Sequence, residues 1–241
     1  MASRAPGELT LEGAAGLPRQ GSGVASHRIA DSLRTAILDG SYLPGERIRQ
    51  EDLAARSGAS RIPAREALRM LDAEGLVTLV ANAGAWVTKL TLAECVETYL
   101  IRERLEPLLL RASMPRLDAA AVDRLGRLAG DMEARAGVEA FMRADREFHL
   151  TSYSGATSGQ AWQIIHRLWN TTQHYRREFT RRAVGTGSSA AGESGLAVTH
   201  LEHRLLLDCV RRGDADDAER VLVMHVRRTR LELSGHPEIF G

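Results

Sequence analysis

The sequence contains no long apolar run and only two cysteines. The longest purely apolar stretches, such as Leu108–Leu110, are far shorter than the roughly 20 residues that a membrane helix needs. The first twenty residues also lack the basic start and apolar core of a secretion signal. Cys95 and Cys209 lie far apart without CxxC spacing, which predicts reduced, buried thiols rather than metal ligands. We therefore expect a cytoplasmic protein without a membrane partner.

Lysine is almost absent, and neither sign of charge dominates. The 241 residues include 32 basic ones, of which only Lys89 is lysine, and 31 acidic ones, so the formal net charge is +1. A nucleic-acid-binding protein often has a conspicuous basic excess, so the net charge alone indicates no partner. With 44% hydrophobic and 26% charged residues, the chain has the composition of a soluble globular protein and the length of two modest domains.

The first ninety residues have the pattern of three helices followed by a hairpin. Residues 1–24 are rich in Gly, Ala, Ser and Pro without apolar periodicity, which predicts a mobile tail. Beyond them, apolar spacing and flanking glycines predict helices, and two β-branched runs flank a turn that holds Asn82 and Gly84. This order is typical of a winged helix-turn-helix domain, here over residues 25–90. The predicted elements are helices 25–39, 50–57 and 60–74 and strands 76–80 and 85–90.

The third predicted helix begins with residues suited to reading DNA. In a helix-turn-helix the N-terminal end of this helix enters the major groove. Ser60 can cap it, and Arg61 and Arg65 are four residues apart, so they share the face opposite the apolar one. Arginine can bind guanine edges or phosphates, although two solvated surface arginines are the plainer alternative. Gly84, near the tip of the predicted wing, would let the backbone approach a phosphate closely, or would only serve the turn.

From Thr91 onward the apolar periodicity is helical throughout. We predict a mostly α protein in which an all-α bundle of six or seven helices, residues 91–235, follows the winged domain. Residues 185–195, GTGSSAAGESG, are expected to form a mobile small-residue loop, and residues 236–241 a C-terminal tail. The predicted helices span 92–113, 118–136, 138–154, 158–183, 196–212 and 215–234.

Four polar residues occupy the apolar faces of three of these helices. Asp145 and His149 are one helical turn apart, and His203 and His225 share apolar stripes on two later helices. Each alone could be a core side chain satisfied by a hydrogen bond, but burying all four unpaired would be costly. Convergence on one cation removes that cost. Three imidazoles and a carboxylate suit Zn, Ni, Co, Fe or Mn rather than Mg or Ca, in a closed tetrahedral site or an octahedral one with open positions.

Several separated segments resemble a known family. Residues 37–77, ILDGSYLPGERIRQEDLAARSGASRIPAREALRMLDAEGLV, followed by AGAWV at 83–87, are similar to the winged-helix domain of the GntR superfamily of bacterial transcription regulators. IRERLEP at 101–107, DREFH at 145–149 and the segment 202–225 resemble the FCD branch of that superfamily, the FadR-like ligand-binding bundles. The resemblance covers most of the chain, with its motifs in the family's order.

The resemblance implies a homodimeric regulator that reads a short inverted repeat in double-stranded DNA and senses a small carboxylate effector. In metal-containing members one Asp and three His hold the ion, and the matching positions are Asp145, His149, His203 and His225. Zinc is the expected ion. Arg102 matches a position that often faces the effector pocket, although a salt bridge is the alternative. Effector binding commonly releases such regulators from DNA, which implies a repressor.

Departures from the family pattern and rival functions leave some points open. SRIPAREAL replaces the usual SRTPVREAL in the reading helix, and Glu51 stands where some relatives have arginine, so the operator sequence cannot be inferred. The ion could be purely structural. It could also activate water in a hydrolase with Glu147 or Glu202 as the base, but nothing else in the bundle resembles catalytic machinery. We expect a regulator and no enzyme activity.

Overall fold

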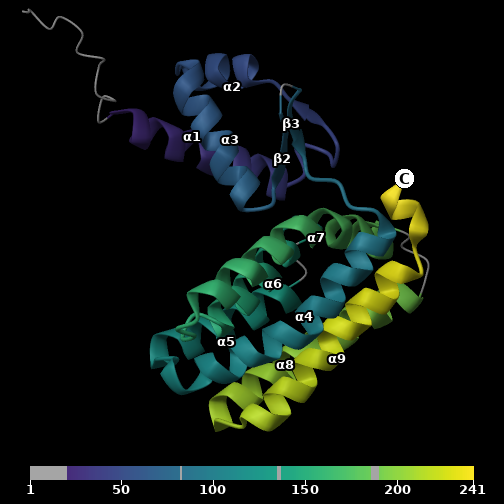
Figure 1. Cartoon of the computed structure of the whole chain (residues 1–241). Coiled ribbons are helices and arrows are strands. Elements are labelled where there is room, and N and C mark those ends of the chain that lie inside the picture. The colour runs from purple at the N-terminus through teal and green to yellow at the C-terminus, as the bar shows by residue number, and fades with distance from the viewer. Residues whose placement is uncertain (1–20, 82, 135–136, 186–189) are drawn as a thin grey trace, which may run out of the picture.

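The computed structural model describes residues 21–81, 83–134, 137–185 and 190–241. The chain folds into a small mixed unit and a larger helical bundle that lie one against the other (Figure 1). Most described residues are helical, and the strands form one small sheet. The predicted fold class, a winged helix-turn-helix followed by an all-α bundle, is confirmed. Among the described helices, none is long and apolar enough to cross a membrane.

In its described part, the smaller unit combines three helices with a three-stranded wing. Its elements are α1 (Gly21–Leu38), β1 (Arg47–Ile48), α2 (Gln50–Ser57), α3 (Arg61–Ala73), β2 (Val77–Val80) and β3 (Gly84–Val87). β3 lies between β1 and β2 and pairs antiparallel with both, so that Trp86 is opposite Arg47 and Thr78. The sequence did not predict β1, because two residues are too short for a periodic pattern. Leu33 and Leu71 contribute to an apolar core between the helices and the sheet.

Glycines set the helix ends around the turn. Gly58, directly after α2, and Gly75, two residues after the end of α3, adopt left-handed backbone conformations with φ of +61° and +77°, as their positions predicted. Ser60 has the extended backbone of an N-cap, but its side chain makes no capping hydrogen bond, so the predicted side-chain cap is wrong. The backbone N–H groups at the start of α3 are therefore not satisfied by Ser60, and a helix start of this kind can bind an anion.

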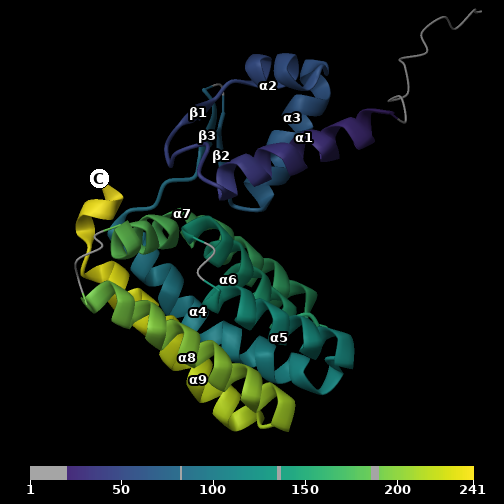
Figure 2. The ribbon, with the colours of Figure 1, turned by 180° about the vertical axis from the view of Figure 1, so that it is seen from behind.

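The larger unit is a bundle of long helices. Within the described residues these are α4 (Leu92–Ser113), α5 (Ala119–Glu133), α6 (Val138–Ser152), α7 (Gly159–Gly185), α8 (Ala190–Arg212) and α9 (Ala215–Ser234). α4 begins with a capping box, in which Thr91 and Glu94 satisfy each other's backbone N–H groups. α4 packs against α9, α5 against α6, and α8 against both α5 and α9 (Figures 1 and 2). α7 lies on the side of the bundle that faces the smaller unit.

The start of α8 differs from the prediction. α8 begins at Ala190, so the part of the predicted loop 185–195 from residue 190 onward is helical. Residues 186–189 lie outside the described residues. Alanine favours helix strongly, and each glycine costs only about 1 kcal/mol in a helix interior, so a long helix with many contacts can include both. The small-residue composition was therefore a poor indicator of a loop.

The two ends of the chain also differ from the predicted tails. α1 begins at Gly21, inside the predicted N-terminal tail 1–24, and the first twenty residues lie outside the described ones, as does Asn82. The predicted C-terminal tail contains a short 3-10 helix, Pro237–Phe240. The Phe240 ring stacks on Tyr175 with centroids 4.5 Å apart, so this end is packed against α7.

Candidate metal centre and nucleic-acid interface

Asp145, His149, His203 and His225 converge inside the bundle. Asp145 and His149 come from α6, His203 from α8 and His225 from α9, and one ligand atom of each lies within 4.8 Å of the others. All four residues are at most 5% exposed. Helical spacing therefore predicted the correct faces of three helices, and the expected convergence is observed.

The outer nitrogens of two imidazoles contact oxygen atoms that can only accept. His203 Nδ1 lies 2.8 Å from the Thr199 carbonyl oxygen, and His225 Nδ1 lies 2.7 Å from Glu202 Oε2. Because neither oxygen can donate, Nδ1 carries the proton in both contacts. When Nδ1 alone is protonated, the Nε2 lone pair points inward. Oxygen acceptors behind the ring are the usual support of histidines that bind metal ions.

The inner nitrogens face one another and an unpaired carboxylate oxygen. His149 Nε2 is 3.1 Å from His203 Nε2. Asp145 Oδ1, a buried atom without a hydrogen-bond partner in the described structure, is 3.3 Å from His203 Nε2 and 3.9 Å from His149 Nε2. Ligands about 2.0–2.1 Å from zinc would be about 3.3 Å apart at a tetrahedral angle and about 2.9 Å apart at a right angle. A cation, either a proton or a metal ion, must balance these lone pairs, and the donor set fits a divalent transition metal.

Burial and one neighbouring arginine keep the cluster in its ligating form. Burial by itself would raise the pKa of the Asp145 carboxyl, but Arg176, with Nη1 2.5 Å from Asp145 Oδ2, holds this pKa well below its usual range. Burial lowers the pKa of His149 well below its ordinary value and also lowers the pKa of His225. Asp145 is therefore ionised and both imidazoles are neutral near pH 7, the states that bind metal ions.

Glu202 and Arg228 support the cluster from behind. Glu202 accepts from His225 Nδ1, and Arg228 Nη2 lies 2.5 Å from the same carboxylate oxygen. Although burial opposes it, these contacts lower the pKa of Glu202 to about 2. The sequence suggested Glu202 only as a base, whereas this carboxylate is turned toward the outer side of the His225 ring. The position of Glu202 directly before His203 in the sequence was the signal that could have indicated this supporting role.

Arg102, the residue implied to face an effector, lies in a buried polar group next to the cluster. Its Nε is 2.5 Å from Glu106 Oε1, and its guanidinium stacks over the Trp169 ring at 4.2 Å. The Tyr153 hydroxyl donates to Glu106 Oε2 at 2.6 Å and lies 3.4 Å from His149 Nδ1. The salt bridge of Arg102 is therefore within α4 and buried, and it connects to the cluster through Tyr153. An effector contact of Arg102 stays a prediction.

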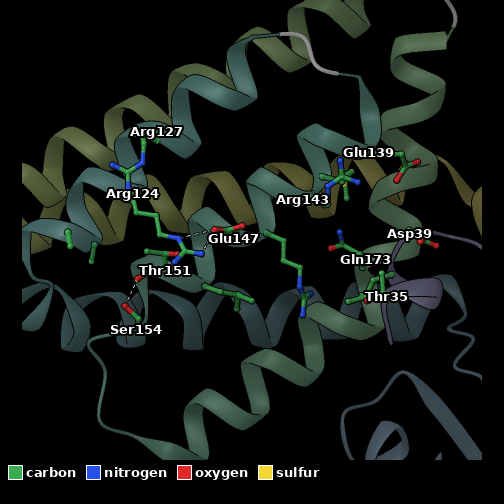
Figure 3. Close-up of a pocket in the computed structure, with 16 residues that line it drawn as sticks. Thr35, Asp39, Arg124, Arg127, Glu139, Arg143, Glu147, Thr151, Ser154 and Gln173 are labelled. Atoms are coloured by element: carbon green, nitrogen blue, oxygen red, sulfur yellow. Dashed lines mark hydrogen bonds and ion pairs between the residues drawn. The ribbon is translucent and has the colours of Figure 1, made fainter. Parts of the chain in front are cut away.

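A separate recess of about 890 Å³ lies between α1, α5 and α6 (Figure 3). Its lining includes Arg124, Arg143 and Glu147, and Arg124 Nε is 2.9 Å from Glu147 Oε1. Neither Arg102 nor any of the four cluster residues lines this recess. Glu147, the other base that the sequence suggested, is thus paired outside the cluster.

The first turn of α3 presents the predicted arginines to solvent. The Arg61 side chain is 72% exposed, and its Nη1 lies 3.7 Å from Glu51 Oε1 on α2. Arg65 is also exposed, whereas Ala64 is fully buried in the domain core. Gln50 Nε2 donates to the Arg61 carbonyl at 2.7 Å and so fixes the start of α3 against α2. Both arginines are free to contact solvent, and their entry into a major groove and their base or phosphate contacts stay predictions.

Arg47 secures the tip of the wing, which the sequence did not suggest. Arg47 Nη2 donates to the Ala83 carbonyl at 3.0 Å, and the guanidinium lies 5.6 Å from the Trp86 ring. Gly84 has φ +130°, and a Cβ there would be in ordinary contact, 3.6 Å from the Arg47 guanidinium. Backbone conformation rather than lack of space thus favours glycine at this position. A close approach of Gly84 to a phosphate stays a prediction.

A helix-turn-helix with exposed arginines at the start of its third helix, followed by a wing and a separate helical bundle, is the architecture of a DNA-binding regulator. Residues 25–87 match the family model for bacterial regulatory proteins of the gntR family, and residues 97–228 match the FCD domain. The chain therefore belongs to the gntR family and carries an FCD domain. It is a DNA-binding transcriptional regulator.

Similar proteins match most of the chain. A transcriptional regulator from an unstable DNA locus of Streptomyces ambofaciens is 28% identical over 214 residues, which cover 87% of this chain and 86% of the relative. The transcriptional repressor GlaR of Escherichia coli K12 is 27% identical over 201 residues, covering 80% and 89%. The solved structure of E. coli McbR/YncC has a TM-score of 0.74 at 19% identity, covering 88% and 98%, and therefore shares the fold.

Proposed function

We propose that this regulator holds zinc or a related divalent ion at Asp145, His149, His203 and His225, and that a small organic acid bound beside the ion changes its operator affinity. The main support is the inward arrangement of imidazole nitrogens around an unpaired carboxylate oxygen. When bound, the ion would supply positive charge and open coordination positions for a carboxylate. The protein would act as a homodimer on an inverted repeat, because a twofold dimer presents two reading helices to two half-sites.

Buried arginines beside the cluster suit an acidic effector. Arg176 contacts Asp145, Arg102 contacts Glu106, and the two guanidinium groups lie over the Trp169 ring at 5.4 and 4.2 Å. A carboxylate entering here would replace one protein carboxylate as a partner, so that no arginine is left buried and unpaired. An acid that competes with Glu106 or Asp145 for its arginine would displace that carboxylate side chain. This displacement is how the acid would change the structure of the bundle.

α6 and α7 connect the cluster to the end of the reading helix. Arg146, next to Asp145, donates to Asn170 Oδ1 at 2.5 Å, and Asn170 Nδ2 donates to the Glu74 carbonyl directly after α3 at 2.9 Å. Arg167, also on α7, donates to two further carbonyls at the end of α3, at 2.7 and 2.9 Å. A displacement of Asp145 would therefore shift the hydrogen bonds at the end of α3, which supports coupling between the two units.

Two adjacent arginines of α7 provide a second connection. Arg176 contacts Asp145, while Arg177 packs beneath Gly40 at the end of α1. A Cβ on Gly40 would lie only 2.5 Å from Arg177 Nη1, so any larger residue there would displace the end of the Arg177 side chain. The acid changes operator affinity only if its affinity differs between the protein conformations in which these junctions are arranged differently.

Metal content tests the proposal directly. Protein purified without chelator should contain about one transition-metal ion per chain, and His203→Ala should lose most of it. His166→Ala is the matched control, because His166 is a partly buried histidine of α7 that lies 3.5 Å from Arg146 instead of in the cluster. Equal metal content in the two variants, measured by inductively coupled plasma mass spectrometry, would remove the metal site from the proposal.

Operator affinity distinguishes a sensor from a purely structural ion. The structural alternative has support of its own, because four buried ligands can close a tetrahedral site. Small mono- and dicarboxylic acids are titrated onto the metal-loaded protein by calorimetry, and binding to an operator selected from random duplexes is measured by fluorescence anisotropy. A sensor should show a roughly 5- to 150-fold change in operator Kd with an acid that binds. A structural ion should raise the Tm and leave that Kd unchanged.

A metal-dependent hydrolase has less support. Glu202 is held by His225 and Arg228 on the outer side of the cluster, and Glu147 is paired with Arg124. Neither carboxylate is directed at the inner nitrogens, beside which an activated water would have to lie.

A further inference from the structure

The recess between α1, α5 and α6 has walls from both units of the molecule. Its volume of about 890 Å³ is in the range of small-molecule binding sites. Thr35, Leu38 and Asp39 of α1 line it together with residues of α5 and α6 and with Gln173 of α7. Figure 3 shows Thr35, Asp39 and Gln173 on one side of the recess and Arg124 of α5 on the other. A molecule of this size would therefore contact the winged unit and the bundle at once.

Two of the three carboxylates in the described lining are already paired with arginines. Arg124 Nε donates to Glu147 Oε1 at 2.9 Å. Glu139 Oε1 accepts from Arg181 Nη2 at 2.9 Å, and Glu139 Oε2 lies 3.2 Å from Arg177 Nε. Arg177 and Arg181 do not line the recess, so Glu139 is neutralised from outside it. Neither carboxylate is left to balance another arginine of the lining.

Three arginines of the lining have no carboxylate partner in the described structure. Arg127 and Arg143 are exposed and make no ion pair there, and Arg146 hydrogen bonds a neutral amide at 2.5 Å. Asp39 is the remaining carboxylate of the described lining, and it accepts from the backbone N–H and the hydroxyl of Ser41 instead of from an arginine. Three such arginines against one carboxylate leave an excess of two positive charges, which favours an anion with a charge near −2.

Gln173 supplies a buried amide to the same recess. The residue is 4% exposed, and its Oε1 is buried without a hydrogen-bond partner in the part of the chain that the structure describes. A buried polar atom without a partner is unfavourable and rare, so a donor that reaches this oxygen would be stabilised. Met142, which is 2% exposed, and the partly buried Leu150 add an apolar part to the lining. The recess thus combines arginines, an amide oxygen without a partner and apolar side chains, which suits an organic anion.

We propose that this recess is a second ligand site and that it binds a small organic phosphate monoester. A phosphate monoester carries a charge of about −1.5 to −2 at pH 7, which matches the excess of positive charge, and guanidinium groups bind phosphate oxygens in bidentate pairs. Its organic part would lie against Met142 and Leu150 and donate a hydrogen bond to Gln173 Oε1. None of the four cluster residues lines the recess, so this site goes beyond the proposed function and does not depend on it.

The position of the site gives its occupant an effect on the winged unit. α1 packs against the reading helix α3. A monoester that contacts both α1 and the arginines of α5 and α6 would therefore restrain the reading helix relative to the bundle. Operator Kd should change at least about fivefold at a saturating concentration of the monoester, without any added organic acid. An unchanged Kd would overturn this restraint.

Calorimetric titration of the full chain tests the site. A panel of sugar phosphates and nucleoside monophosphates is titrated alongside the same sugars and nucleosides without phosphate. At least one monoester should bind, and its uncharged counterpart should bind at least about tenfold more weakly. Arg143→Gln should weaken this monoester about tenfold to a hundredfold, because it removes a charge-assisted hydrogen bond. Arg104→Gln is the matched control, since Arg104 of α4 is also exposed and without an ion pair among the described residues but does not line the recess.

A second variant tests the other side of the recess. Gln173→Leu has a similar volume but no polar group, so it should weaken the monoester about threefold to tenfold. Circular dichroism reports whether each variant is folded. If no monoester of the panel binds, or if the wild type, Arg143→Gln and Gln173→Leu all bind one equally well, the proposal is overturned.

The metal cluster provides the remaining control. His203→Ala removes a candidate metal ligand outside the recess and should bind the monoester as the wild type does. Loss of binding in His203→Ala, with Arg143→Gln unaffected, would place the anion at the cluster and overturn the second site. A chain that binds the monoester in the recess and holds no metal would keep this site and remove the metal from the proposed function.

Discussion

The two halves of the molecule bury different kinds of residue. Among the described residues, the buried side chains of the winged unit are apolar apart from Ser26, whereas the bundle buries the four cluster residues together with several arginines and glutamates. An apolar core is stabilised by hydrophobic burial and is indifferent to ligands. A buried polar centre is stable only while every charge has a partner, so a new partner can rearrange it. The contrast indicates that the winged unit keeps its shape, whereas the bundle can rearrange when a ligand binds.

The largest effect is expected from removing a charge of the polar centre. Asp145→Ala leaves Arg176 buried without its carboxylate and removes one candidate metal ligand, so the free energy of unfolding should fall by about 3–5 kcal/mol. Urea unfolding followed by circular dichroism measures this change. Asp123→Ala, at an exposed position of α5, should change the same quantity by less than about 0.5 kcal/mol. An Asp145→Ala bundle as stable as the wild type would show that Arg176 does not depend on this carboxylate.

A cavity in the apolar core should affect only the winged unit. Leu71 is fully buried on α3, and Leu71→Ala should lower the free energy of unfolding of this unit by about 2–4 kcal/mol. Operator affinity should fall with it, while metal content stays at the wild-type level. Calorimetry and metal analysis of the same sample measure both quantities. Loss of the ion in this variant would mean that the two units unfold together, and the contrast between them would lose its meaning.

Much of the fold could be predicted because a helix that buries one face has apolar residues at regular intervals in its sequence. α6 and α9 each bury one largely apolar face, so their apolar spacing predicted their extent closely. β1 and the 3-10 helix Pro237–Phe240 are too short to show a period, and both depend on contacts with distant residues such as Trp86 and Tyr175. The start of α8 was missed because glycine and serine were given more weight than alanine.

The site could be predicted in its ligand set but not in its surroundings. His203 and His225 disturb apolar stripes, and a polar residue on an apolar face is visible in the sequence. The partners of these residues lie on other helices or turn outward, as Arg176, Glu202 and Tyr153 do. Which arginine meets which carboxylate depends on helix packing at the scale of an ångström, and spacing along the chain carries no information on it.

A smaller effect is expected where the two units meet. Asn170→Ala removes the hydrogen bonds from Arg146 and to the Glu74 carbonyl, which should lower the free energy of unfolding by about 1–2 kcal/mol. If this junction transmits the response, the acid-dependent change in operator Kd should shrink while metal content and acid affinity are kept. Gln163→Ala, at an exposed position of α7, should leave all of these values unchanged. A full acid response in Asn170→Ala would assign the coupling to another contact, such as that of Arg177 with Gly40.

The smallest effect is expected from protonation at the same junction. His174, on α7, lines a small recess together with Gly75 and Leu76 of the winged unit, and its Nδ1 is buried without a partner in the described structure. Burial, reinforced by Arg177, lowers the pKa of His174 from 6.5 to about 4. The folded state therefore binds this proton less tightly than the unfolded state, so stability is fully present above pH 6.5 and declines as the pH falls toward 4.

His174→Gln tests this dependence because glutamine cannot take up the proton. After allowance for the partial exposure of the ring, wild type should lose about 1 kcal/mol relative to His174→Gln between pH 7 and pH 5. Urea unfolding at the two pH values gives the difference, and His27→Gln, at an exposed position of α1, should follow the wild-type profile. Parallel profiles for wild type and His174→Gln would mean that the ring gains a proton acceptor when charged. The junction would then accommodate a new charge by rearranging, as the polar centre of the bundle does. The difference in response to charge would in that case be confined to the two cores and would not include the junction.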